Sequence, residues 1–303
     1  NYTGIIGKQL GGRVSKIKMS DIKINAGLTV STGSSYERVG GLIGFADGDT
    51  KIQDIEAENV TVYGRHYVGG IVGFASNAQF NYDNINGGKT KTKIVARDMK
   101  VVGTGEQIGG IIGRYYGAWR WPNACYGLEI YGTPTTDPVK TTVAGREVIT
   151  GSTTVITSTR NSGNIHLGGL IGYSYEVENG AGWGHKVDGI VVQGNSSYMG
   201  GAFGYALHLS ETTVSNTLIR NTRVVDGLKG SATVNPTYGY ERVGGVIGNC
   251  YGGLTGCYAD NVQMDLQNAR RVGLLSGLKE GGGELNNSFV TFSDIKLKST
   301  LDC

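Results

Sequence analysis

The sequence predicts an all-β fold, and within that class a right-handed β-solenoid of about eight rungs with insertions in its loops. Three observations lead to this prediction. A glycine-rich motif recurs from one end of the chain to the other, a second motif alternates with it, and no stretch shows sustained helical periodicity. A short unit repeated at variable spacing is typical of solenoids, in which each repeat adds one rung and the loops absorb insertions. We therefore expect residues 1–303 to form a single elongated domain.

The first motif has the form apolar-Gly-Gly-apolar-apolar-Gly, as in residues 39–44, and degenerate copies lie at 4–7 and 272–277. Two adjacent apolar residues follow the glycine pair. We therefore expect a strand with a buried inner side, on which stacked glycines let the opposite wall approach closely. The second glycine of each full copy is the predicted scaffold position. These glycines are Gly41, Gly70, Gly110, Gly169, Gly201 and Gly245.

The second motif is a short segment that begins with Asp or Asn, as in Asn59-Val60-Thr61-Val62. Its apolar residues alternate with Lys, Thr or Arg, which predicts a strand with one buried and one exposed face. The leading Asp or Asn predicts a turn, because these side chains bond to nearby backbone groups and tolerate left-handed backbone angles. Each rung would then combine one copy of each motif.

The copies of the first motif resemble the GLUG motif, a Gly-Leu-hydrophobic-Gly repeat of bacterial surface and secreted proteins. That family includes adhesins and the region ahead of the catalytic domain in immunoglobulin A1 proteases. The resemblance extends over nearly the whole chain. It implies a β-solenoid in an extracellular setting, either secreted or at the cell surface. It implies no reaction, because the repeat of that family contributes scaffold positions and no catalytic residues.

The longest interval between scaffold glycines runs from Gly110 to Gly169 and contains a Thr-rich segment with several β-branched runs. Such runs favour strands. We predict that residues 133–164 leave the solenoid as a protruding β-arm.

Aromatic residues gather before this arm and in the loop of the next rung. Trp and Tyr offer flat apolar area with a polar tip, so these residues are a candidate surface for a protein partner or a glycan. The alternative is that the rings cover the rung from which the arm emerges. The candidate surface comprises Tyr115, Tyr116, Trp119, Trp121 and Trp183.

The four cysteines allow several interpretations. Cys250 and Cys257 flank a Gly-rich segment that we expect to turn, which would bring them together as a local disulfide. The alternative is a pair of buried thiols. Cys125 and Cys303 lie several rungs apart, so they are candidates for a disulfide between subunits.

Four Asn-x-Ser/Thr sequons are compatible with a glycosylated extracellular protein. They begin at Asn1, Asn59, Asn195 and Asn286.

Composition argues against several classes of partner. The net charge is +3 with 17% charged residues, which is too mild for a nucleic-acid groove. No apolar run approaches the roughly 20 residues of a transmembrane helix. Asp47, Asp49 and Asp54 lack the spacing of a calcium loop and are interpreted as polar turns. We predict no metal and no cofactor.

Catalysis would require carboxylates that converge from neighbouring rungs. The candidates are Glu56, Glu58, Asp98 and Asp188. All four fall at turns of the second motif, where Asp and Asn are expected to satisfy backbone donors. We therefore predict that the protein is not an enzyme.

The predicted function is structural. The motifs begin by residue 4 and end at Leu297, and exposed solenoid ends present unpaired backbone groups. We expect other copies to cover them, which makes the chain a subunit of a surface filament or matrix fibre stacked head to tail. The alternatives are an adhesin stalk with a glycan-binding aromatic patch and a β-helix carbohydrate-active enzyme.

Overall fold

A computed structural model of the chain describes residues 1–27, 37–83, 88–89, 92–117, 125–143, 146–160, 164–176, 184–194, 197–225, 242–266 and 269–297. These residues form strands and turns, and none of them lies in a helix. The predicted all-β class is therefore confirmed. Most strands belong to four parallel sheets, here called A, B, C and D, and this arrangement is compatible with a β-solenoid.

Sheets A and B are built from the glycine-rich motif. The strand before the glycine pair lies in sheet A and the strand after it lies in sheet B, so the glycines form the corner between the two sheets. Sheet A contains β1 (Tyr2–Thr3), β5 (Arg38–Gly40), β9 (Val68–Gly69), β16 (Gln107–Gly109), β22 (His166–Gly168), β26 (Tyr198–Gly200), β30 (Arg242–Gly244) and β34 (Arg271–Gly273). Sheet B contains β2 (Ile6–Leu10), β6 (Ile43–Asp47), β10 (Val72–Ser76), β17 (Ile112–Tyr116), β23 (Ile171–Glu176), β27 (Phe203–Ser215), β31 (Ile247–Thr255), β35 (Ser276–Glu280) and the short β36 (Leu285–Asn286).

Sheets C and D flank the Asp or Asn of the second motif. Sheet C contains β3 (Arg13–Ser20), β7 (Lys51–Glu58), β11 (Gln79–Phe80), β14 (Ile94–Arg97), β18 (Leu128–Tyr131), β24 (Lys186–Asp188), β28 (Leu218–Arg220), β32 (Tyr258–Asp260) and β37 (Phe289–Thr291). Sheet D contains β4 (Lys23–Asn25), β8 (Thr61–Gly64), β15 (Lys100–Gly103), β21 (Val155–Ser158), β25 (Val191–Gln193), β29 (Arg223–Val225), β33 (Gln263–Leu266) and β38 (Asp294–Leu297).

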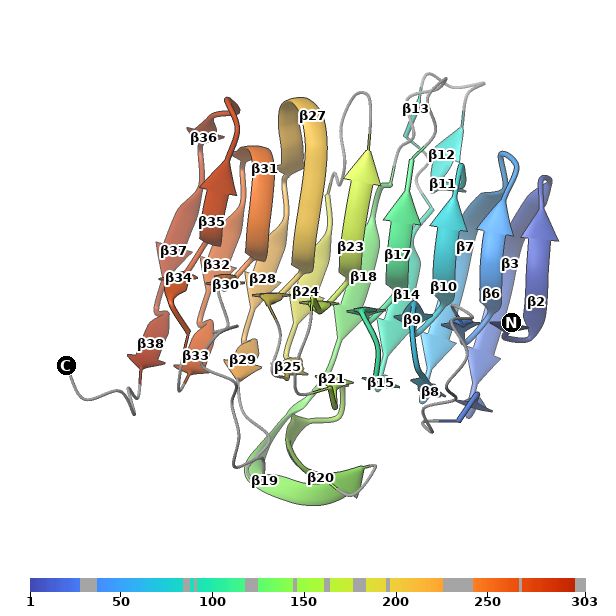
Figure 1. Cartoon of the computed structure of the whole chain (residues 1–303), viewed down its shortest axis with the longest axis horizontal. Helices are drawn as coiled ribbons and strands as arrows, with labels where there is room; N and C mark the ends of the chain where they lie inside the picture. The colour runs from blue at the N-terminus through green and yellow to red at the C-terminus, as the bar shows by residue number, and fades with distance from the viewer. Residues whose placement is uncertain are drawn as a thin grey trace.

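The chain visits the sheets in the order A, B, C, D and then begins the next layer, so a layer is one strand from each sheet (Figure 1). The layers follow one another along the long axis, with β2 at one end and β35 at the other (Figure 1). The turn between sheets C and D has the predicted chemistry. Asp21, Asn59 and Asp98 hold positive φ values of 56°, 51° and 52° there, which Asp and Asn tolerate better than most residues.

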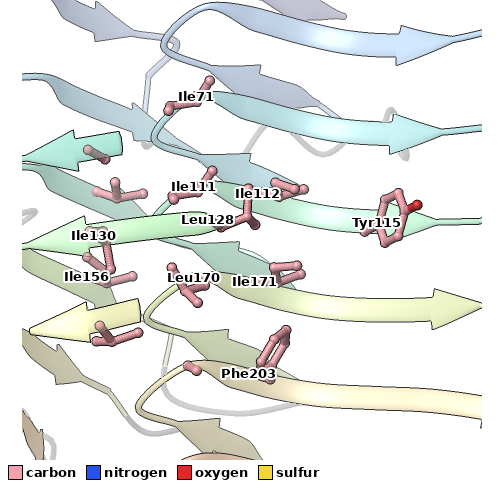
Figure 2. Packing of buried hydrophobic residues seen from close by; sticks show 14 of the residues in the cluster. Ile71, Ile111, Ile112, Tyr115, Leu128, Ile130, Ile156, Leu170, Ile171 and Phe203 are labelled. Atoms are coloured by element: carbon pink, nitrogen blue, oxygen red, sulfur yellow. The ribbon is translucent and has the colours of Figure 1, made fainter. Parts of the chain in front are cut away.

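Register between layers is regular except where β27 pairs with β31, where it shifts between Leu207 and Val214, and it stacks apolar side chains into columns inside the molecule. Ile112, Ile171 and Phe203 are successive partners in sheet B and form one such column (Figure 2). Ile111 and Leu170 lie in the adjacent column at the corner and are fully buried (Figure 2). The core is therefore narrow and continuous along the axis, as parallel strands buried between two walls require.

The predicted arm is shorter in the structure than in the prediction. β19 (Pro134–Val143) and β20 (Arg146–Ser152) form an antiparallel hairpin that projects from the sheets (Figure 1). The residues after the hairpin do not leave the stack, because β21 pairs with β15 and β25 in sheet D. A second antiparallel pair, β12 (Tyr82–Asp83) with β13 (Gly88–Lys89), lies in the connection between β11 and β14 of sheet C.

Candidate functional site

The scaffold glycines stand where neighbouring layers approach most closely. A Cβ atom at Gly41 would collide with the carbonyl oxygen of Gly70 in the next layer, and one at Gly70 would collide with that of Gly110. Gly169, Gly201 and Gly245 have the same relation to the layer that follows each of them. The closest approach at these glycines is therefore between the backbones of consecutive layers, along the axis of the stack.

The opposite wall contributes as well, as the motif predicts. A Cβ at Gly70 would lie 2.7 Å from Cε of Met99, whose side chain comes from the turn between sheets C and D. Ile130 and Ile190 occupy the corresponding places beside Gly110 and Gly169. Glycine at these positions therefore admits both a neighbouring backbone and a large apolar side chain from across the core.

Two positions that flank the motif carry a cluster that the sequence analysis missed. The residue two places before the glycine pair and the residue after the last glycine project on the outer side of sheets A and B. There, cationic side chains lie over aromatic rings of their own and adjacent layers. We call this cluster the arginine–aromatic ladder, and its members are Tyr2, Lys8, Arg38, Phe45, Tyr67, Phe74, Arg114, His166, Tyr173, Tyr198, Tyr205 and Arg242.

Arg114 shows how the ladder joins layers. Its guanidinium carbon lies 5.3 Å from the ring centre of Tyr67 and 5.2 Å from that of Phe74, both in the preceding layer. It lies 5.4 Å from the ring of Tyr173 in the following layer. The same side chain donates a 3.2 Å hydrogen bond from Nη1 to the Tyr67 hydroxyl. Each such contact contributes of order 1 kcal/mol when partly desolvated.

His166 is a buried polar ring of the ladder. It stacks on Tyr198 with ring centres 4.7 Å apart and meets Tyr173 edge-on at 4.9 Å. Burial lowers the pKa of His166 to about 3, so the ring is neutral at physiological pH. A neutral histidine here acts as an aromatic spacer between layers.

The predicted aromatic surface is corrected by the structure. Tyr115 is completely buried, its hydroxyl donates to the carbonyl oxygen of Ala78 at 3.2 Å, and its ring meets Phe80 edge-on. Side chains alternate along β17, so Tyr116 faces outward and stacks on Tyr175 with ring centres 4.8 Å apart. Tyr115 therefore belongs to the core and is unavailable to a ligand. Trp119, Trp121 and Trp183 lie outside the described residues.

The predicted disulfide between Cys250 and Cys257 is wrong. The segment interpreted as a Gly-rich turn is the second half of β31, which pairs with β27 as far as Thr255. The thiol of Cys250 points to the carbonyl of Gly252, and that of Cys257 points to the carbonyl of Val214, so the two remain separate thiols. Burial raises the pKa of the Cys257 thiol to about 11, which keeps it protonated and unreactive.

The structure also excludes one of the two cysteines considered for a disulfide between subunits. Cys125 is buried beside Phe80 in sheet C, where another subunit has no access to its sulfur. Cys303 lies outside the described residues.

The sequons have different settings. Asn1 is exposed, and Asn286 is exposed with its amide bonded to Glu284. Asn59 donates from Nδ2 to Oδ1 of Asp21 at 2.6 Å, as part of the turn between sheets C and D. Asn195 lies outside the described residues.

The candidate carboxylates only partly converge. Glu58 and Asp98 line an open cavity of about 800 Å³ together with Asp21 and Lys100. Glu56 instead forms an ion pair with Lys18 at 2.9 Å. Asp188 stands apart and accepts a 2.9 Å hydrogen bond from the side-chain amide of Asn221. The cavity is a polar recess beside the turn from sheet C to sheet D, and the absence of catalysis stays a prediction.

The residues considered for calcium are turn residues. Oδ1 of Asp47 accepts hydrogen bonds from the backbone of Gly48 and the side chain of Asn77. Asp49 and Asp54 both have positive φ. Within the described ranges, no group of three or more His, Cys, Asp and Glu side chains has an arrangement that could hold a metal ion.

The two ends of the stack are the most apolar parts of the exposed surface. Among the described residues, the large apolar side chains that are more than half exposed all lie in the first or the last layer. Phe292 is the extreme case at 89%. The full set is Ile5, Leu10, Leu285, Phe289, Phe292 and Leu297.

No known protein family, curated protein or solved structure matches the chain. The part of the chain that the structure describes contains no helix with the length and apolar character needed to cross a membrane. Function must therefore be argued from the stack itself.

Proposed function

We propose that the chain is an extracellular structural protein that stacks head to tail into a filament or matrix fibre. In this proposal the four sheets form a right-handed solenoid of about eight rungs, in keeping with the GLUG resemblance. Neither the stalk of an adhesin with a glycan-binding patch nor a carbohydrate-active enzyme is favoured by a specific contact, and both stay predictions.

The observation that carries the proposal is the apolar, open surface at each end. Ile5 belongs to the interior corner column of the stack and Val290 to an interior column of sheet C, yet they are 54% and 38% exposed. Corresponding residues in the middle layers are fully buried, as Ile71 and Ala96 are. At each end, the strands also present main-chain donors and acceptors along an open sheet edge. Such edges template pairing with another chain.

A second copy is the occupant that fits both ends. The first layer is the continuation of the last layer in strand order, strand direction and corner position, so one copy extends all four sheets of another. Such an interface joins two different surfaces and does not close on itself, which generates a polymer.

The test is a measurement of mass against concentration by light scattering. The unsubstituted chain is expected to form larger species as its concentration rises. Val290→Glu places a charge in an interior column at the apolar end and should shift association to at least about tenfold higher concentration. Tyr251→Glu, which changes an exposed aromatic residue of sheet B away from the open edge, is the matched control and should associate normally. A monomer at all concentrations contradicts the proposal.

A further inference from the structure

From the register of the sheets we infer which residues meet when two copies stack: Asp294 of one copy lies beside Lys23 of the next, and Lys279 lies beside Gln9. This inference rests on the proposed function and adds the alignment of the interface.

The alignment follows from columns that run through the whole stack. In sheet D, Lys23 pairs with Thr61 at one end, and Gln263 pairs with Asp294 at the other. The intervening pairs place all of these residues in one column. If a second copy adds its first strand by the same step, Lys23 of that copy follows Asp294 at the strand spacing of about 4.8 Å.

The side chains brought together in this way are complementary. Lys23 and Asp294 are both exposed and oppositely charged, and opposite charges directly across neighbouring strands stabilise a sheet. One residue further along, Ile24 and Ile295 share the next column and are only half-buried at their respective ends. Stacking would complete the burial of both.

A column of sheet B gives an independent indication of the same alignment. It runs through Ala46, Ala75 and Tyr115, all fully buried, and ends in Gln9 in the first layer and Lys279 in the last. Long polar side chains thus occupy this inner column at its two ends. A buried ammonium group requires a polar partner, and the alignment supplies the side-chain oxygen of Gln9.

Other alignments lack these matches. A shift by one residue would place Lys23 beside Ile295. Because side chains alternate in direction along a strand, every inner apolar column of one copy would then meet an outer column of the other. The inner columns therefore exclude a shift by one residue, and the outer ion pair between Lys23 and Asp294 distinguishes this alignment from shifts by two.

Charge exchange across the interface tests the inference. Lys23→Glu alone and Asp294→Lys alone should each raise the concentration for half-maximal association by about three- to tenfold. The double variant Lys23→Glu/Asp294→Lys should return to within about twofold of the unsubstituted chain. Lys100→Glu makes the same change in net charge in the same column of sheet D but in a middle layer, away from both ends, and should have little effect.

Cross-linking provides a second readout. A mixture of Lys23→Cys and Asp294→Cys chains should form cross-linked dimers, whereas Asn25→Cys mixed with Asp294→Cys should form far fewer. Chains that assemble but cross-link better in the second mixture would overturn the alignment and leave the filament intact. Chains that never assemble would overturn both proposals.

Discussion

At the scale of single residues, the fold depends on glycines that serve two contacts at once. Gly70 faces the backbone of Gly110 in the next layer and the side chain of Met99 across the core. Neither neighbour can move away cheaply, because one is main chain that is hydrogen-bonded to the next layer at the corner between sheets A and B, and the other is a fully buried side chain.

Gly70→Ala should therefore lower the free energy of unfolding by at least about 2–3 kcal/mol through overpacking. Gly282→Ala is the control, because a Cβ at Gly282 meets nothing within 4 Å. Denaturant unfolding of the two variants provides the comparison. Equal, small losses would show that the layers can separate without cost.

A buried histidine gives stability a dependence on pH. His185 is fully buried, its Nδ1 accepts a 3.1 Å hydrogen bond from the backbone of Leu128, and its ring meets Phe203 edge-on. Burial lowers the pKa of His185 to about 3, whereas an unfolded histidine titrates near 6.5. The neutral ring therefore contributes stability that is fully present above about pH 6.5 and is lost as pH falls toward 3.

His185→Gln removes this titration but keeps a side-chain oxygen that can accept the hydrogen bond from Leu128. Between pH 7 and pH 4, the variant should lose about 2–3 kcal/mol less unfolding free energy than the unsubstituted chain. His66→Gln changes a less buried histidine and should alter the pH profile less. Parallel profiles for His185→Gln and the unsubstituted chain would contradict the assignment.

At the scale of elements, the ladder on sheets A and B holds consecutive layers together from outside the core. Arg114→Ala removes contacts to four rings and a hydrogen bond to Tyr67, and should cost about 2–3 kcal/mol of unfolding free energy. Arg97→Ala is the control, because that exposed side chain lies over the single ring of Tyr131 and should cost less than about 1 kcal/mol. Equal changes in the melting temperature of the two variants would show that the ladder does not stabilise the stack.

The hairpin of β19 and β20 is the element that the stack needs least, because it pairs with itself. Replacing residues 136–149 by a two-residue turn should leave the sheets folded, with a melting temperature within a few degrees of the original. Extending the deletion through β21 should prevent folding, because β21 lies between β15 and β25 in sheet D. Circular dichroism melts check both outcomes, and loss of structure in the shorter deletion would place the hairpin in the core.

The sequence predicted the conformation of an element where local residues determine it, and failed where pairing with a distant strand determines it. The glycine corners and the Asp or Asn turns were predictable, because they recur and each needs a particular backbone conformation. The turn predicted between Cys250 and Cys257 was wrong, because pairing with β27 holds this Gly-rich segment in an extended conformation.

The ladder was detectable but missed. Its signal is the repetition of Arg, Tyr, His and Phe at the two positions that flank the glycine motif, such as Arg38 and Phe45. The assignment of Tyr115 to the surface could have been avoided by the alternation of side chains along β17, which sets it opposite to Tyr116. The ends of the stack required coordinates, since exposure in the first and last layers depends on which strands pair.

At the scale of the whole molecule, the layers stack along one axis, and we propose that the two ends bind each other. Sheets A and D each have 8 strands, so one chain adds about eight strand spacings to the axis. In any polymer formed by continuous stacking, each subunit would therefore add a fixed length along the filament axis.

Electron cryo-microscopy of the assembled protein measures that length directly. Stacking in the inferred alignment predicts an axial repeat of roughly 38 Å per subunit, with an uninterrupted spacing of about 4.8 Å between strands across the junction. Filaments with a longer repeat and a gap in the strand spacing, or a solution that contains only single rods at every concentration, would contradict the central claim that the two ends of this chain bind each other.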